Sequence, residues 1–487
     1  MKLGILAAAS LASGSLAASV RSTQRRADSP HVVRLNIWRN DADPIQTHAL
    51  RRRQTVETTI DNMLTLYFVN ATVGSPPQEV KLHVDTGSSD MWVNTPSSEY
   101  CSAERRPCAN AGTYDPAHST TQKFIDNTFN ISYVDGSGAS GDFVTDVLTI
   151  GGTTVEDLQF GVGTNSSSPR GILGIGYTTN EASVLRDGAK PYENLPVKLA
   201  SQGHIQSAAF SMFLNDVDSR TGTVLFGGID KSHFTGNLVT VPIQKENDKF
   251  RRLLVTLNKV QFDSTAVGSD LALAVLLDSG SSITYLPDAI AKAIYEQVDA
   301  TYVEDQGLAF VPCTDRDSSH SITFTFDDPL SIVVPYSELV LDIPTSRGRR
   351  PVFDNGRAAC LFGIAPAESG SNVLGDTFMR SAYVVFDLAN NEISMAQAAA
   401  AGDGTQSDVA EIGVGKSAVP GATRAQNPVT ATQGFTNSGQ NVTSGAGGQE
   451  SGAGTGGSRS ASGLARGAKA AAVLAGVVTA LATVVLT

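Results

Sequence analysis

Positive charge is scarce in this chain. Its 487 residues include 36 Lys and Arg against 48 Asp and Glu, which gives a net charge of −12. Nucleic-acid binding needs a clustered basic face for the phosphates, so this composition disfavours a nucleic-acid partner. Charged residues make up only 17% of the chain and apolar residues 41%, so a large packed core is expected rather than wholesale disorder.

Several common catalytic motifs are absent. The seven histidines are scattered and form no H-E-x-x-H, and the chain has neither a G-x-S-x-G nucleophile elbow nor a Walker loop. The run GILGIG at 171–176 lacks the spacing of a dinucleotide-binding loop. The four cysteines do not have the spacing of a zinc site. We therefore expect no metal and no cofactor.

Long helical patterns are also missing between residues 54 and 398. Short apolar runs alternate there with Gly, Asp, Asn and Ser turns, which favours strands. Residues 129–152 read as a hairpin with an Asp-Gly tip, and 210–230 as a second hairpin around SRTG. Only brief helices are expected, such as the one over 287–298. The sequence thus predicts an all-β body.

Both chain ends carry processing signals. Residues 1–18 read as a secretory signal peptide, because Lys2 precedes a Leu/Ala run with small residues near Ala17. Basic clusters follow at 24–27 (QRRA) and 50–54 (LRRRQ). We interpret residues 19–53 as a propeptide that a dibasic-specific protease cuts after Arg53.

The C-terminal part has a different composition. Residues 399–460 are rich in Gly, Ala, Ser and Thr and predict a flexible stalk with too little apolar surface to fold. Residues 461–487 end in the uncharged run 470–487, which is typical of a glycosylphosphatidylinositol (GPI) attachment signal. Ser460 is the favoured attachment site and Gly456 the alternative. The other interpretation is that the terminal run itself spans the membrane.

Cysteines and sequons fit a secreted protein. Of three possible disulfide pairings, we favour the one that joins sequence neighbours, Cys101–Cys108 and Cys313–Cys360. Candidate N-glycosylation sites are Asn70, Asn130, Asn165 and Asn441. Asn130 lies in an expected strand that is predicted to shield it.

An internal repeat carries the chemistry. LHVDTGSSDMWVN at 82–94 matches VLLDSGSSITYLP at 275–287: an apolar run, Asp, a hydroxyl residue, Gly, Ser-Ser and a second apolar run. Each copy is followed by an apolar-apolar-Gly element, GILGIG at 171–176 and NVLGDT at 372–377. One D-[ST]-G tripeptide is a weak signal, but two with the same flanks and the same distant partner predict a pair of related aspartate loops.

These motifs, together with YVDGS at 133–137, resemble those of pepsin-type aspartic endopeptidases, and most closely the fungal yapsin-like, GPI-anchored branch. The resemblance implies an all-β, bilobal pepsin-like fold with two β-barrel-like lobes related by pseudo-two-fold symmetry and an active-site cleft between them. We assign residues 54–240 to the N-terminal lobe and 241–398 to the C-terminal lobe. The resemblance also implies a monomeric protein at the cell surface, on the plasma membrane or in the wall, that hydrolyses proteins or peptides at acidic pH.

The resemblance assigns a role to each loop residue. Asp85 and Asp278 form the catalytic dyad, in which two close carboxyls share a proton and activate a water without a covalent intermediate. Gly87 and Gly280 let the backbone approach the carboxyls. The hydroxyl residues that support the dyad fall into two pairs: Thr86 and Ser279 bond across the lobe interface, and Ser88 and Ser281 bond to the carboxylates.

The YVDGS motif corresponds to the mobile flap of the family. Tyr133 lies on the flap with Asp135 and Gly136, and Trp92 is expected to brace the tyrosine. Val134 stands where the family usually has Gly. Asp135 resembles the acidic flap residue of fungal relatives that accept a basic residue before the cut; a solvated turn Asp is the alternative. The competing function is a catalytically inactive member acting as a surface-binding or cell-wall protein.

Overall fold

The computed structural model describes residues 30–39, 66–343, 350–368, 370–399 and 406–435. The expected signal peptide, the basic run at 51–53, Asn441, Ser460 and the terminal apolar run all lie outside these ranges. No helix within the described ranges is both long and apolar enough to cross a membrane. All elements below belong to the unit that begins at His31.

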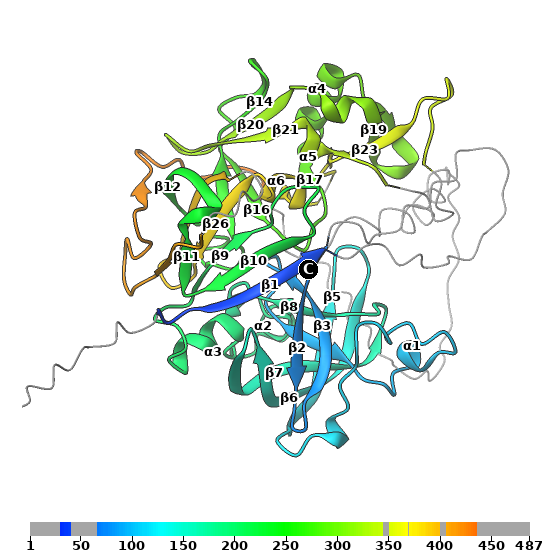
Figure 1. The fold of residues 1–487 in the computed structure, drawn as a ribbon, viewed down its shortest axis with the longest axis vertical. Helices are drawn as coiled ribbons and strands as arrows, with labels where there is room; N and C mark the ends of the chain where they lie inside the picture. Colours follow the sequence, from blue (N-terminus) through cyan, green and yellow to red (C-terminus); the bar gives the residue numbers. More distant parts are fainter. Residues whose placement is uncertain (1–29, 40–65, 344–349, 369, 400–405, 436–487) are drawn as a thin grey trace, which may run out of the picture. The chain divides into compact units, whose positions relative to one another are not determined.

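One extended sheet contains most of the strands (Figure 1). Its order is β29 (Thr423–Arg424), β12 (Phe234–Pro242), β27 (Glu392–Ala398), β26 (Ala382–Asp387), β9 (Ala209–Phe213), β10 (Thr221–Phe226), β1 (Val33–Arg39), β2 (Tyr67–Val73), β3 (Gln78–Asp85), β8 (Gly171–Gly174), β4 (Met91–Asn94), β7 (Thr153–Ser166), β6 (Gly138–Ile150) and β5 (Lys123–Ser132). Strand β2 also pairs with β6. Both hairpins expected from the sequence are present, as β5–β6 and β9–β10.

The second half of the chain forms three smaller sheets. They comprise β13 (Leu254–Leu257), β16 (Leu273–Leu277), β25 (Val373–Leu374), β17 (Thr284–Leu286) and β24 (Ile364–Pro366); β15 (Thr265–Gly268), β14 (Lys259–Phe262), β20 (Ser321–Thr325) and β21 (Ser331–Pro335); and β18 (Thr301–Val303), β19 (Leu308–Pro312), β23 (Ala359–Phe362) and β22 (Val340–Leu341). A two-stranded pair joins β11 (Gly228–Asp230) to β28 (Val409–Glu411).

The described helices are short. They are α1 (Glu99–Ser102), α2 (Ala182–Asp187), α3 (Leu195–Ser201), α4 (Asp288–Val298), α5 (Tyr336–Leu339) and α6 (Asp376–Met379), with 3-10 turns at Pro116–His118, Thr178–Asn180, Lys231–His233, Glu304–Gln306 and Cys313–Asp317. Helix α4 forms where the sequence predicts it, because Ile290, Ile294 and Val298 recur every four residues and are buried together. It ends at Asp299, which adopts a left-handed conformation.

The two halves of the chain contribute strands to one sheet, and the expected lobe boundary lies within that sheet. Strand β12 contains both residues 240 and 241, so the boundary falls inside one strand. Strand β12 pairs with β27, and β9 pairs with β26, so the last strands of the second half complete the sheet of the first. Short apolar runs cannot reveal this pairing, because both partners look like ordinary buried strands.

Residues 406–435, here called the C-terminal belt, correct the expected stalk. The belt lies on the body rather than extending from it: β28 pairs with β11, and β29 runs parallel to β12 (Figure 1, orange). Ile412 is fully buried, and Val419 and Ala431 are each only 6% exposed. The average composition of the segment is rich in Gly, Ala and Ser. A few buried apolar residues and backbone hydrogen bonds are nevertheless enough to hold it against the body.

The segment interpreted as a propeptide contains an inner strand of the large sheet. Strand β1 lies between β10 and β2, and its alternate residues Val33, Leu35 and Ile37 are at most 3% exposed. They belong to the main hydrophobic core, which extends through both halves of the chain. The described chain is thus predominantly β and carries related motifs in its two halves, which confirms the fold class expected from the resemblance.

Candidate active site

Two equivalent strand arrangements carry the repeated aspartates. Asp85 is the last residue of β3, which runs parallel to β8 and places Asp85 beside Gly174. Asp278 follows β16, which runs parallel to β25, and the Asp278 amide donates to the carbonyl of Leu374 at 3.2 Å. Each aspartate therefore leaves its strand next to the apolar-apolar-Gly element that follows it in the sequence.

The same correspondence continues on the far side of each turn. Strand β4 pairs antiparallel with β8, through Trp92 and Ile172, and β17 pairs antiparallel with β25, through Tyr285 and Val373. Strand β4 also runs parallel to β7, as β17 does to β24. The sequence repeat is therefore a structural repeat of two aspartate loops.

Thr86 and Ser279 join the two loops through reciprocal hydrogen bonds. The Thr86 amide donates to Ser279 Oγ at 3.2 Å, and the Ser279 amide donates to Thr86 Oγ1 at 2.9 Å. Each hydroxyl also donates to a backbone carbonyl of the opposite loop, of Leu277 and Val84, both at 2.9 Å. All four bonds are buried and fix the register of one loop against the other.

The loop glycines lie against the opposite carboxyl. A Cβ atom on Gly87 would lie 2.6 Å from Oδ1 of Asp278, and a Cβ on Gly280 would come closer still to Oδ1 of Asp85. Any side chain at either position would therefore push the loops apart. Gly87 and Gly280 also donate their amides to the carboxylate of their own loop, each at 2.8 Å.

Both carboxyls are fully buried, which raises the pKa of each above the ordinary value for Asp. Asp85 also accepts hydrogen bonds from Ser88 and the Gly87 amide, which favour its ionised form. The pKa of Asp278 is raised well above the usual range by burial and by the negative charge of Asp85. The pair can thus hold one proton between two acidic groups, with the proton favoured on Asp278.

One expected contact differs from the sequence interpretation. Ser88 Oγ donates to Asp85 Oδ2, but Ser281 Oγ donates to the carbonyl of Ile283 at 3.1 Å rather than to Asp278. The expected role of Ser281 is therefore not found in this structure. The repeat conserves residue type at this position, but Ser281 turns to a nearby backbone acceptor, an alternative that is open to any serine in a turn.

The expected flap, YVDGS at 133–137, forms the turn between β5 and β6. The Tyr133 amide donates to the Ser137 carbonyl and the Gly136 amide to the Tyr133 carbonyl, each at 2.9 Å, and Gly136 has a φ of +77°. The Tyr133 hydroxyl accepts a 2.6 Å hydrogen bond from Trp92 Nε1, and both rings are buried. The structure thus places the tryptophan beside the tyrosine, as the sequence predicts.

The tip of the flap carries Val134 and Asp135. Val134 is 54% exposed, so its side chain is not part of the core. Asp135 Oδ1 accepts hydrogen bonds from the Ser137 amide at 2.8 Å and the Ser137 hydroxyl at 2.6 Å. Burial nevertheless raises the pKa of Asp135 above its ordinary value. One carboxylate oxygen therefore stabilises the turn.

A buried polar cluster behind the flap is missing from the sequence interpretation. Asp90 Oδ1 accepts from the Tyr192 hydroxyl at 2.8 Å, and Oδ2 accepts from the Ala182 amide at 2.9 Å. Glu181 Oε2 accepts from the Tyr192 amide at 3.0 Å. Burial raises the pKa of Asp90 to about 6, and burial, reinforced by the Asp90 charge, raises that of Glu181 to about 9.

This cluster connects the Asp85 loop to the segment around α2. Tyr192 also packs against the hydrophobic cluster that contains Trp92 and Tyr133. The available sequence signal for Asp90 is its place directly after DTGSS, in a run that is otherwise apolar. Glu181 and Tyr192 have no such signal, because they stand about 90 to 100 residues further along an irregular segment.

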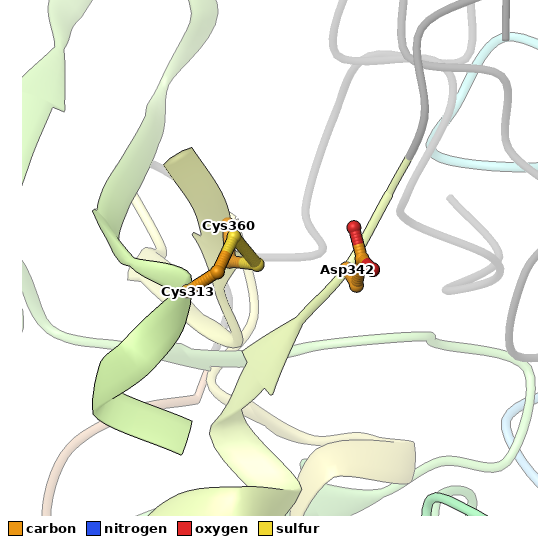
Figure 2. A group of neighbouring side chains, drawn as sticks. All are labelled: Cys313, Asp342 and Cys360. Carbon is orange, nitrogen blue, oxygen red and sulfur yellow. A yellow bond between two sulfur atoms is a disulfide. The ribbon is translucent and has the colours of Figure 1, made fainter. Parts of the chain in front are cut away.

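The cysteines form disulfides, Cys101–Cys108 and Cys313–Cys360. Asp342 lies near the second disulfide, as Figure 2 shows. Both sulfurs are bonded to each other, so neither is a thiolate that could hold a metal ion, and Asp342 is ion-paired with Arg350. The group is therefore a disulfide beside a carboxylate rather than a metal site.

Three sequons lie in described strands, and Asn70, Asn130 and Asn165 are all exposed. The expectation that strand structure shields Asn130 is therefore wrong. Asn130 faces Ser140 across the β5–β6 ladder, and Ser140 faces Asn165 across the β6–β7 ladder. Directly opposed residues share one face of a sheet, so Asn130 on β5 and Asn165 on β7 lie on the same face of the large sheet.

The fold and the paired aspartate loops define an aspartic peptidase. The family model described as "Eukaryotic aspartyl protease" matches residues 66–398, and the chain belongs to this family. Among curated relatives, "Probable aspartic-type endopeptidase opsB" of Aspergillus oryzae is 48% identical over 418 residues, 84% of either chain. "Probable aspartic-type endopeptidase OPSB" of Arthroderma benhamiae is 46% identical and covers 86% of each chain.

A more distant relative is "Secreted aspartic protease 1" of Candida albicans, which is 38% identical over 355 residues, 71% of this chain and 84% of that protein. The family and the relatives identify the chain as an aspartic-type endopeptidase, which acts on proteins or peptides. The match to the family model ends at residue 398, so the C-terminal belt lies outside it.

Proposed function

We propose that this protein is an acid endopeptidase in which Asp85 and Asp278 act as one catalytic unit. The observation that carries the proposal is the reciprocal set of hydrogen bonds between Thr86 and Ser279, which holds two buried carboxyls against each other's glycine. A purely structural role does not account for two buried carboxyls held in this way. Their mutual repulsion would lower the stability of the folded protein unless they share a proton.

The reaction follows from one shared proton. The ionised carboxyl, favoured on Asp85, takes a proton from a water as its oxygen attacks the scissile carbonyl carbon. The protonated carboxyl of Asp278 gives its proton to the carbonyl oxygen, so a neutral tetrahedral diol forms. Asp85 then gives its proton to the amide nitrogen, and Asp278 takes back a proton from one hydroxyl of the diol as the C–N bond breaks. The products leave as a carboxylic acid and an amine. The dyad ends with one proton, as it began.

The flap supplies the closing element. Tyr133 is the first residue of the turn between β5 and β6 and is held by Trp92, and the next residue, Val134, is exposed at the tip. We propose that the hairpin closes over bound peptide and excludes water, with Gly136 allowing the tight turn. The bulk of Val134 at the tip is then one determinant of which side chains fit beneath it.

We also propose that Asp135 gives a preference for a basic residue before the cut. Its Oδ1 is bonded by Ser137, which leaves Oδ2 as the oxygen available to a substrate cation. Because the pKa of Asp135 is raised, this preference should weaken as the pH falls. Peptides that differ only at the residue before the cut should lose their Lys/Arg signal in Asp135→Thr; an unchanged cleavage profile would remove Asp135 from the subsite.

The route to the cell surface is proposed from the chain ends. A secretory signal at 1–18, a propeptide to Arg53 and a GPI signal after Ser460 agree with the two disulfides and with the name of the Candida relative, "Secreted aspartic protease 1". Asn70, Asn130 and Asn165 are exposed, so each is accessible for N-glycosylation. A phospholipase that cuts the glycolipid should release the protein from cells, whereas a membrane-spanning terminal helix would keep it there.

The test of activity uses the secreted, processed protein. It should cleave a peptide library between about pH 3 and 6, and a statine-type mimic of the tetrahedral intermediate should block cleavage. Asp85→Asn should abolish activity, whereas Asp218→Asn, at an exposed ion pair with Arg316, should not. A correctly folded protein that cleaves nothing at any acidic pH would instead support the alternative function, an inactive surface-binding protein.

A further inference from the structure

Strand β5 leads into the expected flap and, among the described residues, is the last strand of the large sheet. Its pairing with β6 is irregular at first, with two register shifts between Phe124 and Phe129. The pairing is regular from Phe129 to Ser132, directly before Tyr133. An edge strand has a row of backbone carbonyls on its outer side that no neighbouring strand can bond. The position of the flap therefore depends on what holds this outer edge.

Arg186, in the last turn of α2, holds the outer edge of β5. Its guanidinium donates to the carbonyl of Asn130 and, through Nη2, to the carbonyl of Thr128 at 3.0 Å. Residues two apart in a strand direct their carbonyls to the same side, so one planar guanidinium can bond both. Asp187 orients the guanidinium, because its two oxygens accept from Nε at 3.1 Å and from Nη2 at 2.6 Å. We call these contacts the Arg186 grip.

The Arg186 grip lies where the regular pairing of β5 with β6 begins. Thr128 and Asn130 stand on either side of Phe129, the first residue of the regular pairing. The Arg186 side chain is only 24% exposed, so its hydrogen bonds are partly shielded from water. Hydrogen bonds from a charged donor are stronger than those between neutral groups. The grip therefore fixes the strand that leads into the flap against α2.

The first residue of α2 is fixed to the Asp85 loop. The Ala182 amide donates to Asp90, which directly follows DTGSS. Ala182 and Leu185 also pack in the hydrophobic cluster that contains Tyr133. Burial and the nearby charge of Asp85 raise the pKa of Tyr133 well above its ordinary value, so Tyr133 lies close to the dyad. One short helix therefore connects the catalytic loop with the strand of the flap.

From these contacts we propose that Arg186 is a positioning residue of the enzyme, which holds β5 against α2 and so keeps Tyr133 where the flap closes over bound peptide. The proposal rests on the proposed function, because Arg186 acts only through the flap. Without the grip, the flap occupies its binding-competent position for a smaller fraction of the time, and the apparent affinity for peptide falls by that fraction. The effect should appear in KM rather than in kcat, because a bound peptide meets the same dyad.

Hydrogen exchange tests the grip without any substrate. In Arg186→Gln the amides of residues 123–137 should exchange at least about five-fold faster than in wild type, whereas those of the other strands should keep their rates. Arg316→Gln is the matched control, since Arg316 is 30% exposed and makes a 2.6 Å ion pair with Asp218. Equal exchange of residues 123–137 in Arg186→Gln and the control would overturn the proposal, whether or not the protein cleaves peptides.

Peptide cleavage at pH 4 tests the role of the grip in substrate binding. Arg186→Gln should raise KM about five-fold and keep kcat within about two-fold of wild type, whereas Arg316→Gln should change neither. Faster exchange with an unchanged KM would overturn the positioning role. Wild-type protein that cleaves nothing would refute the proposed function instead, and the exchange experiment would still decide whether the grip exists.

Arg186→Lys separates the grip from the effect of charge. Burial raises the pKa of Asp90, and the charge of Arg186 opposes this to a smaller extent, an effect that lysine would keep. A single ammonium group cannot reproduce the planar fork that bonds two carbonyls and Asp187. Arg186→Lys should therefore retain most of the rise in KM. Full rescue by lysine would show that charge alone matters and would overturn the grip.

Asp187→Asn keeps the test informative if Arg186→Gln folds poorly. It leaves Arg186 in place but weakens the contact that orients the guanidinium. Exchange of residues 123–137 and KM should both change in the same direction as in Arg186→Gln, by a smaller factor. If Arg186→Gln does not fold, wild-type exchange and KM in Asp187→Asn would overturn the proposal.

Discussion

At the scale of single residues, the two loops are joined by side-chain hydroxyls, whether these come from serine or from threonine. Ser279 keeps the hydrogen bonds that its position requires and lacks only the methyl group that threonine would add. The methyl is thus dispensable for joining the loops, whereas the hydroxyl is not.

We therefore expect opposite results from two substitutions at this position. Ser279→Ala leaves the Thr86 amide and the Val84 carbonyl without their partner and should cost about 1–3 kcal/mol of unfolding free energy. It should also lower kcat, because the loops lose their register. Ser279→Thr should keep both near wild type. Chemical denaturation and peptide cleavage at pH 4 measure the two effects; equal losses in both variants would show that packing, not hydrogen bonding, holds the loops.

A second prediction concerns the buried Glu181. The pKa of Glu181 is raised to about 9 in the folded protein, so protonation of Glu181 favours the folded state. This contribution to stability is fully present below the pKa of Glu181 in the unfolded chain, and it is lost as the pH rises toward 9. Glu181→Gln stays neutral throughout. The two proteins should have similar Tm values at pH 4, and the variant should be more stable at pH 8, by a few kcal/mol at most. Parallel Tm curves from pH 4 to 8 would contradict this.

The sequence predicts the two paired aspartate loops but not their complete surroundings. The loop repeat singles out Asp85 and Asp278 because the same short motif occurs twice. It misplaces Ser281, since residue type does not say which of two nearby acceptors a hydroxyl chooses. It misses Glu181 and Tyr192 because their meeting with Asp90 depends on how an irregular segment folds back.

At the scale of elements, the flap hairpin and the strand that braces it form a coupled pair. Trp92 on β4 and Tyr133 at the end of β5 are joined by one buried hydrogen bond between elements that are not neighbours in the sheet. This bond links flap position to the Asp85 loop, since β4 follows that loop directly.

A double-mutant cycle tests this link. Trp92→Phe and Tyr133→Phe each remove one partner of the bond, and both should lower kcat/KM because the flap loses its fixed position. The double variant should be little worse than the poorer single one, which corresponds to a coupling of about 0.5–3 kcal/mol. Effects that simply add would mean that the two rings contribute separately through packing.

The elements also show where composition misleads. The C-terminal belt has the average composition of a stalk, yet Ile412 is fully buried and the backbone of Val429 donates to Asp327 at 2.8 Å. Conversely, β1 lies in a segment that reads as a removable propeptide, yet it supplies apolar residues to the core. Hairpins and α4 were predictable because their signals are local; sheet partners from distant segments were not.

At the scale of the whole molecule, the buried carboxyls connect the proposed acid activity with the pH dependence of stability. Asp85, Asp278, Asp90 and Glu181 all have raised pKa values because burial penalises their charged forms. Each of these carboxyls therefore costs less stability at acidic pH, where it is protonated and neutral. Asp230 is the opposite case, since its hydrogen bonds keep it charged.

This balance predicts the pH profile of kcat/KM. Activity needs one dyad carboxyl ionised and the other protonated, so it should fall in strong acid when both are protonated and toward neutrality when both are ionised. Because burial raises both pKa values, the bell should be centred above the pKa of an ordinary Asp, about 3.9. Initial rates from pH 2 to 8 measure it. A rate that keeps rising to pH 8 would contradict a shared-proton dyad.

The most direct test of the central claim compares Asp85→Asn, Asp278→Asn and the double variant with wild type at pH 4, with Asp218→Asn as the control. All are first verified as folded by circular dichroism. If the two aspartates act as one unit, each single variant should lose at least ~10³-fold in kcat and the double should lose no more than the poorer single variant. Substantial activity in either single variant, or losses that multiply in the double, would contradict the account.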